Sequence, residues 1–146
     1  MNILFASSEV VPFAKTGGLA DVVGALPREL AKLGHNPIVF APAYRCARQC
    51  GQPIEPTEMT VSVRVGSRDV RGRILRSCLP DSEVPVYLVE QDDYFDRSEL
   101  YRVEGEDYRD NCERFAFFCR AVVQSIGSLD SPIDVVHCND WQTGLI

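Results

Sequence analysis

The segment K-T-G-G-L-A-D-V, residues 15–22, separates a strand-like run from a helix-like run, and this arrangement constrains the fold most. Residues 2–6 are a short apolar run, which is typical of a strand buried on both faces of a parallel sheet. After the segment, apolar residues recur at spacings of three, four and seven, which predicts a helix that ends at Gly34. An α/β fold places ligands at such a crossover. The predicted apolar stripe of the helix is Leu19, Val22, Val23, Leu26, Leu30 and Leu33.

Further strands are predicted at residues 37–42, 84–89 and 134–138. The first of these completes a right-handed β-α-β unit, although Pro27 predicts a kink or break in its helix. The sequence therefore predicts an α/β fold with a Rossmann-like, doubly wound and mostly parallel sheet.

Residues 60–65 and 70–75 alternate in the strand period on either side of Gly66, which predicts an inserted β-hairpin with one solvent-facing side. Residues 44–56 lack periodicity and are predicted to be a loop. The arginines of the hairpin form either a basic patch for a polyanion or, as we favour, a solvated face. They are Arg64, Arg68, Arg71, Arg73 and Arg76.

A second helix is predicted to run to about residue 126, with Asp110 or Asn111 at its N-cap. Polar residues 139–144 follow the last predicted strand, and functional residues favour the carboxyl ends of such strands. The apolar stripe expected on this helix is Phe115, Phe118, Cys119, Val122, Val123 and Ile126.

The residues of the crossover indicate an anion site. Gly17 and Gly18 allow close approach of the backbone, the first helical amides are expected to be unpaired, and Lys15 adds a positive charge. Together they would seat a phosphate or pyrophosphate, although the glycines lack the spacing of a G-x-G-x-x-G or Walker A loop. A tight strand-to-helix turn with a solvated lysine explains the same residues.

The amino-acid composition excludes several classes of function. The net charge of -6 argues against a general nucleic-acid or anionic-membrane surface, and no apolar run or leader pattern predicts a membrane span or secretion. We therefore expect a cytoplasmic protein, or a plastid one if it is a plant protein without its transit peptide. Six cysteines are scattered through mostly apolar segments, which favours buried free thiols, and with two histidines no structural zinc site is expected. Glu90, Asp92 and Asp93 resemble a metal cluster, but solvation explains them better.

Two segments resemble signatures of bacterial glycogen synthases and plant starch synthases. The first is S-E-V-V-P-F-A-K-T-G-G-L-A-D-V, residues 8–22, and the second is V-V-H-C-N-D-W-Q-T-G-L, residues 135–145. The segments Y-F-D-R, residues 94–97, and D-N-x-x-R-F, residues 110–115, also resemble family blocks. The first two segments bracket almost the whole chain of 146 residues.

The resemblance implies a B-type glycosyltransferase (GT-B) fold, in which two Rossmann-like domains face each other across a cleft. Residues 1–146 would be an incomplete N-terminal, acceptor-side domain. A C-terminal domain that supplies most nucleotide contacts would be absent. The implied reaction transfers glucose from ADP-glucose, or UDP-glucose, to the nonreducing end of an α-1,4-glucan with retention of configuration. No metal or other cofactor is implied, and the isolated chain is expected to be inactive.

Roles for individual residues come from the same resemblance. The residues implied in catalysis are Lys15, Asp21, Asp110, His137, Asn139 and Asp140. Those implied in substrate binding are Glu9, Lys15, Gly17, Gly18, Asp21, Phe95 and Trp141.

Structural explanations stay open for several of these residues. Helix capping would explain Asp110, pinning of a long surface loop would explain Phe95, and a strand end with an aromatic anchor would explain His137 to Trp141. Asn139 stands where many relatives have histidine, so no imidazolium can act at this position. The alternative to an enzyme is a non-catalytic module that binds a sugar nucleotide or an oligosaccharide.

Overall fold

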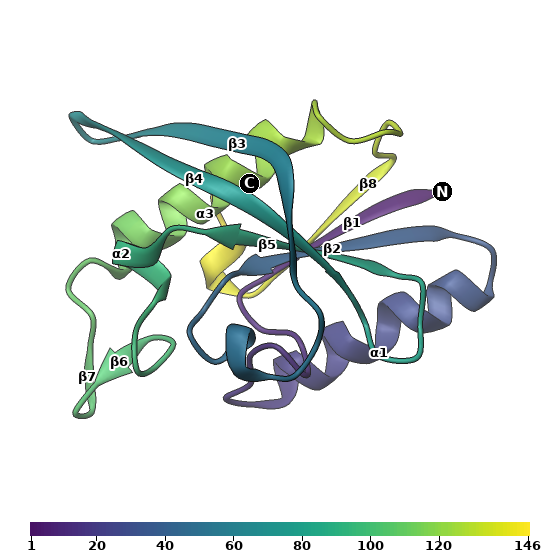
Figure 1. The fold of residues 1–146 in the computed structure, drawn as a ribbon, viewed down its shortest axis with the longest axis horizontal. Coiled ribbons are helices and arrows are strands. Elements are labelled where there is room, and N and C mark those ends of the chain that lie inside the picture. The colour runs from purple at the N-terminus through teal and green to yellow at the C-terminus, as the bar shows by residue number, and fades with distance from the viewer.

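The apolar run at the N-terminus forms β1 (Asn2–Ser7), an interior strand of the sheet in the computed structural model, which describes all 146 residues. It pairs in parallel with β2 (Asn36–Pro42) on one side and with β8 (Val135–Asn139) on the other. β5 (Pro85–Glu90) extends the parallel part beyond β2. The sheet order is β3-β4-β5-β2-β1-β8 (Figure 1), which confirms the α/β fold with a mostly parallel sheet.

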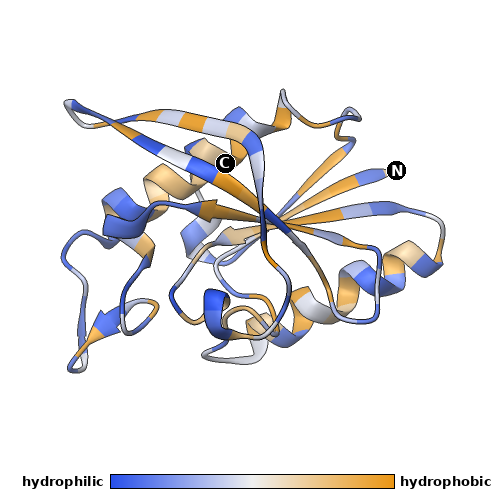
Figure 2. Ribbon diagram, viewed as in Figure 1, coloured by the Kyte–Doolittle hydropathy of each residue, from blue (hydrophilic) through white to orange (hydrophobic).

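Two long helices cover opposite faces of this sheet (Figure 1). α1 (Gly18–Lys32) follows β1, and α3 (Asn111–Ile126) precedes β8. Two apolar clusters result, because the side chains of a strand alternate between the faces. Ile3 and Phe5 of β1 belong to the cluster beneath α1, and Leu4 and Ala6 to the cluster beneath α3. Figure 2 shows the central strands as the most hydrophobic part of the ribbon.

The remaining elements are short. α2 (Asp92–Phe95) follows β5, and β6 (Arg102–Val103) and β7 (Glu106–Asp107) form a small separate ladder. Two 3₁₀ turns occur, one at Ala47–Gln49 inside the predicted loop and one at Trp141–Thr143 after β8. None of the helices has the length and apolar character needed to cross a membrane.

The helical stripe predicted for α1 is only partly right. Val22 and Leu33 are 52% and 73% exposed, whereas Val23, Gly24 and Pro27 are buried. The buried side of α1 contains smaller residues than predicted because Gly24 lies against Val11. An added Cβ at Gly24 would come within 2.3 Å of a Val11 methyl group. The helix runs through Pro27 without the predicted break, and it ends before Gly34, whose φ is 82°.

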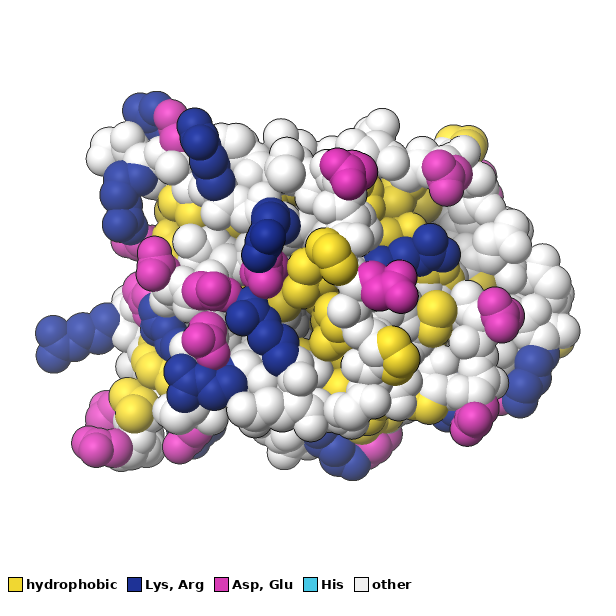
Figure 3. Space-filling view, viewed as in Figure 1, with side chains coloured by type: hydrophobic (Ala, Val, Ile, Leu, Met, Phe, Trp, Pro, Cys, Tyr) yellow, Lys and Arg dark blue, Asp and Glu magenta, His cyan; other side chains and the backbone are white.

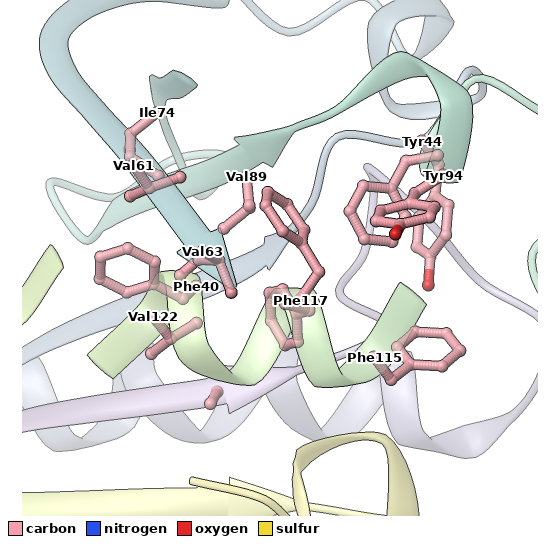
Figure 4. Packing of buried hydrophobic residues seen from close by; sticks show 14 of the residues in the cluster. Phe40, Tyr44, Val61, Val63, Ile74, Val89, Tyr94, Phe115, Phe117 and Val122 are labelled. Carbon is pink, nitrogen blue, oxygen red and sulfur yellow. The ribbon is translucent and has the colours of Figure 1, made fainter. Parts of the chain in front are cut away.

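α3 is covered more completely than the sequence pattern predicts. Arg114 and Phe117 are fully buried although neither belongs to the predicted stripe, and Val123 of the stripe is exposed. The hairpin covers Phe117, since β3 contacts α3 and an added Cβ at Gly72 would lie 2.9 Å from the Phe117 ring. Arg114 is covered by the segment before α3, because its guanidinium group lies over the Tyr108 ring and donates to the Tyr94 carbonyl oxygen. Figure 4 shows Phe117 pointing into the cluster formed with Val61, Val63 and Phe40.

The hairpin consists of β3 (Glu55–Val65) and β4 (Arg68–Cys78) and is longer than predicted. Its register shifts between Pro56 and Thr60, and β4 joins it to β5 in antiparallel pairing. Its five arginines are exposed, as the solvated-face prediction requires, and Figure 3 shows basic and acidic side chains intermixed on the visible surface. Gly72 is indispensable to the packing, because a Cβ there would lie 2.7 Å from the Glu90 carbonyl oxygen and 2.9 Å from the Phe117 ring.

All six cysteines are free, as predicted, but the prediction that they are buried is wrong for most of them. Only Cys119 is buried, because it lies on the inner face of α3, where its thiol donates to the Gln142 carbonyl oxygen at 3.2 Å. Cys138 is exposed because it belongs to the edge strand β8.

Candidate functional site

The order of the strands reverses between β1 and β8. From β1 the chain moves outward to β2, and from β5 it returns through α3 to the opposite side of β1. Such a switch point opens a crevice at the carboxyl ends of the two strands, where α/β proteins bind ligands. Two segments meet there: the crossover loop, residues 8–17, and the β8 turn, residues 140–144. Together with the first turn of α1 and the end of β8, these segments contain all of the predicted site residues except Asp110 and Phe95.

Glu9 organises the crossover loop from inside. Its carboxylate accepts hydrogen bonds from the Thr16 amide at 2.6 Å, the Thr16 hydroxyl at 2.6 Å and the Gly17 amide at 3.2 Å. The side chain is buried, with 4% of its surface exposed. Burial by itself would raise the pKa of Glu9, but the hydrogen bonds from Thr16 and other donors lower the pKa below its ordinary value. Glu9 is therefore a charged structural anchor of this loop.

The prediction that the amides around Gly17 and Gly18 are free for an anion is right for Gly18 and wrong for Gly17. The amides of Thr16 and Gly17 already bind Glu9. The amides of Gly18 and Leu19, at the first turn of α1, have no hydrogen-bond partner in the chain. They keep the partial positive charge of a helix N-terminus and are the donors available to an anion.

Lys15 and Asp21 meet across the start of α1. The Lys15 ammonium group lies 2.6 and 2.8 Å from the two carboxylate oxygens of Asp21, and both side chains are about half exposed, at 51% and 56%. Two residues predicted from one sequence segment thus form one ion pair at the surface. An exposed pair of this kind contributes little to stability, and either partner can exchange for a ligand group.

His137 and Asn139 lie on β8 beside β1. The Asn139 side-chain amide donates to the carbonyl oxygens of Ala6 and His137, both at 3.0 Å, so it ties the ends of the two strands together. The His137 ring contacts the edge of the Phe5 ring at a centroid distance of 4.8 Å and remains exposed. Asn139 has a structural role, while His137 presents an imidazole at the open edge of the sheet.

The β8 turn presents an aromatic surface. Asp140 has a φ of 65°, in the left-handed region, and its carboxylate accepts a hydrogen bond from the Trp141 amide at 2.7 Å. Trp141 is 57% exposed, although its ring contacts Phe115 at 5.2 Å and Tyr101 at 6.3 Å between centroids. A fixed indole with a free surface is suited to stacking on a sugar or another flat apolar face.

Tyr101 is the residue of this site that sequence reasoning missed. Its hydroxyl group lies 2.8 Å from both Ser8 Oγ and Glu9 Oε1, so it donates to the carboxylate and accepts from the serine. Burial raises the pKa of Tyr101 well above its ordinary value, which keeps the hydroxyl protonated. The sequence pattern could not pair Tyr101 with Glu9, because a contact between residues 92 positions apart has no local sequence signal.

Asp110 lies at the N-cap position of α3, but its side chain does not cap the helix. Its carboxylate binds the Arg97 guanidinium through two contacts of 2.5 and 2.8 Å. Hydrogen bonding to Arg97 lowers the pKa of Asp110. Neither group has an ion pair or hydrogen bond to Lys15 or Asp21, so the structure does not bring Asp110 into contact with the crossover loop.

Phe95 is the predicted binding residue whose position contradicts its prediction. It is fully buried, with its ring against Tyr44, Tyr94 and Phe117, so it has no free face on which a sugar could stack. Figure 4 shows that the neighbouring rings of Tyr44 and Tyr94 lie close together beside α3. The alternative explanation, an aromatic side chain that pins the loop, fits the structure.

The prediction that Glu90, Asp92 and Asp93 are solvated is right for Asp93, which is exposed, but incomplete for the other two. Glu90 accepts hydrogen bonds from Arg48 at 3.1 Å and from Arg73 at 2.6 Å, and Asp92 binds Arg48 at 2.5 Å. The basic partners come from other strands and loops, which is why the sequence did not reveal them. No group of three or more potential metal ligands occurs in the structure.

Comparison with known proteins places this geometry in a family. Residues 2–146 match the family described as the starch synthase catalytic domain. Glycogen synthases of Rhodopirellula baltica and Syntrophotalea carbinolica are 45% and 48% identical over the full chain. The chain spans 31% and 30% of the length of these two relatives.

A solved structure shows the same fold. The catalytic domain of starch synthase IV from Arabidopsis thaliana, bound to ADP and acarbose, superimposes with a TM-score of 0.83 at 26% identity. The match covers 99% of this chain and 28% of the Arabidopsis chain.

Proposed function

Because this chain belongs to the starch synthase catalytic domain family, we propose that it forms the acceptor-side part of a retaining glucosyltransferase. The enzyme would transfer glucose from a nucleotide-glucose to the nonreducing end of an α-1,4-glucan. The main support is the meeting of Lys15, the free amides at the start of α1 and the exposed Trp141 around one switch point. By themselves, residues 1–146 would lack the donor-side domain and would not turn over.

The proposed glucosyl transfer requires stabilisation of the leaving diphosphate. When the glucosyl group departs, the sugar becomes oxocarbenium-like and negative charge grows on the phosphate oxygens. The Lys15 ammonium group, together with the amides of Gly18 and Leu19, would bind those oxygens, as fixed cationic groups in a closed cleft can. Lys15 would exchange the Asp21 carboxylate for a phosphate oxygen, which would release Asp21 to accept hydrogen bonds from sugar hydroxyl groups.

The β8 turn would orient the sugars. Trp141 offers a free ring surface, and Asp140 and His137 place polar groups at the same end of the sheet. Closure of a second domain over this edge would align donor and acceptor and exclude water. Asn139 would act through the strand geometry that it maintains, since its side chain is occupied by two carbonyl oxygens.

ADP-glucose is the donor that we favour over UDP-glucose. The Arabidopsis starch synthase IV structure contains ADP, and this chain matches it over 99% of its length. The same structure contains acarbose, an oligosaccharide analogue, which is consistent with a glucan acceptor here.

The experiment is a transfer assay with the full-length protein. Glycogen is the acceptor, and ADP-glucose and UDP-glucose are supplied in parallel. We expect incorporation of glucose from ADP-glucose at a rate at least tenfold above that from UDP-glucose. Incorporation from neither donor would overturn the proposal, and binding of ADP without turnover would instead favour a non-catalytic sugar-nucleotide module.

A further inference from the structure

Tyr101 links the crossover loop, the β8 turn and α3 through a single side chain. Its hydroxyl group donates to Glu9 and accepts from Ser8 in the crossover loop. Its ring contacts Trp141 of the β8 turn at 6.3 Å and Phe115 of α3 at 5.9 Å between centroids. No other residue makes both a hydrogen bond to the Glu9 carboxylate and a ring contact with Trp141.

The backbone of Tyr101 is held as firmly as its side chain. Its carbonyl oxygen accepts from the Asn111 side-chain amide at 2.9 Å and from the Tyr108 amide at 3.0 Å. Asn111 in turn accepts from the fully buried Arg114 at 2.6 Å. A continuous path of hydrogen bonds therefore runs from α3 through Tyr101 and Glu9 to the amides of the crossover loop.

We propose that Tyr101 is a positioning residue for the transfer reaction, acting through Glu9 on the placement of Lys15. This inference rests on the proposed function. The Glu9 carboxylate fixes Thr16 and Gly17, which directly follow Lys15 and directly precede the free amides of α1. Tyr101 gives Glu9 a donor from outside the loop, so that the loop has one orientation relative to Trp141. Without this donor, the Lys15 ammonium group and the Trp141 indole no longer keep a fixed position relative to each other.

The test is a double-mutant cycle in the full-length enzyme, in which Tyr101→Phe and Glu9→Gln are made singly and together. Tyr101→Phe removes only the hydroxyl group. We expect it to lower kcat/KM for the donor roughly tenfold, equivalent to about 1.4 kcal/mol. In the Glu9→Gln background the same change should cost less than about twofold, because a residue that acts through Glu9 has little left to act on.

Tyr87→Phe is the matched control, because the Tyr87 ring stacks on Phe40 in the sheet and its hydroxyl makes no hydrogen bond. It should leave kcat/KM within twofold of wild type. An equal loss from Tyr101→Phe in both backgrounds would overturn the proposal, and so would a Tyr101→Phe enzyme within twofold of wild type.

Hydrogen exchange separates this inference from the proposed function. In Tyr101→Phe, the amides of residues 13–20 should exchange at least about tenfold faster, while β1 and α3 exchange as in wild type. If the wild-type protein transfers no glucose, the proposed function fails and this measurement alone decides the role of Tyr101. Unchanged exchange at residues 13–20 would contradict it.

Discussion

The crossover loop and the β8 turn leave the same end of the sheet, but their carboxylates are placed in opposite ways. Glu9 is buried and accepts hydrogen bonds from Thr16, Gly17 and Tyr101. Asp140 is exposed, and its side chain accepts from the neighbouring Trp141 amide. The comparison teaches that a signature segment can contain residues that build the site and residues that face a ligand, and that burial with saturated hydrogen bonds distinguishes them.

The largest expected effect concerns Lys15, the exposed cation of the crossover loop. Lys15→Gln in the full-length protein should lower kcat about 100-fold or more, because one charge-stabilising donor typically contributes that factor. Its thermal midpoint should stay near wild type, since the ion pair with Asp21 is half exposed. Lys32→Gln, which also removes an exposed ion-paired lysine, is the control. Activity of Lys15→Gln within twofold of wild type would remove Lys15 from the ligand-facing group.

Glu9 should show the reverse pattern, with stability as the main loss. Glu9→Ala leaves the donors of Thr16 and Gly17 without their acceptor, and we expect it to lower the free energy of unfolding by about 2 kcal/mol. Urea titration of the full-length protein measures this, with the exposed Glu29→Ala as the comparison. Equal stability of the two variants would break the distinction between the buried and exposed carboxylates.

Within β8 and its turn, Asn139 and Asp140 provide a closer comparison of adjacent positions. Asn139→Ala removes two hydrogen bonds to backbone carbonyls and should cost roughly 1 to 1.5 kcal/mol of unfolding free energy. Asp140→Asn keeps an acceptor for the Trp141 amide and has the same side-chain shape at the positive φ, so it should cost less than about 0.5 kcal/mol. Urea titrations of the two variants test this, and a greater cost for Asp140→Asn would contradict the structural role of Asn139.

The smallest effect is an acid dependence that belongs to Glu9. The pKa of Glu9 is lower in the folded protein than its ordinary value of 4.5, so the ionised carboxylate stabilises the fold above that pH. As pH falls below 4.5 and through the lowered pKa, this contribution is lost. Unfolding free energy measured against pH should therefore decline more steeply below that value in wild type than in Glu9→Gln. Parallel curves would mean that Glu9 is not held as an anion.

The sequence predicted the elements well because apolar periodicity is a local property. The β1-α1-β2 unit, β5, α3 and β8 all occur where the pattern places them. Which side of a helix is buried was predicted less well. In α1 the larger side chain of Val22 faces outward and Gly24 faces inward, because contact with Val11 requires a residue without a Cβ. Periodicity indicates an apolar side but not the shape of the neighbour that covers it.

The site was predicted through its residues but not through their partners. The pairing of Lys15 with Asp21 is local, and the same segment contains both. The hydrogen bond of Tyr101 to Glu9 and the ion pair of Arg97 with Asp110 depend on how loops return to the sheet. For this reason the sequence predicted free amides at both Gly17 and Gly18, whereas Glu9 occupies the Gly17 amide and leaves that of Gly18 free.

The irregular register of β3 has a consequence for the behaviour of the protein in concentrated solution. β3 is an edge strand of eleven residues, long enough to recruit a strand from another molecule. Its shift near Pro56 interrupts the ladder, the Ser62 amide is taken by the Gln124 side chain, and Arg64 places a charge along the edge. Each feature discourages intermolecular pairing, so this edge should resist aggregation even though β3 itself contains Val61, Val63 and Val65.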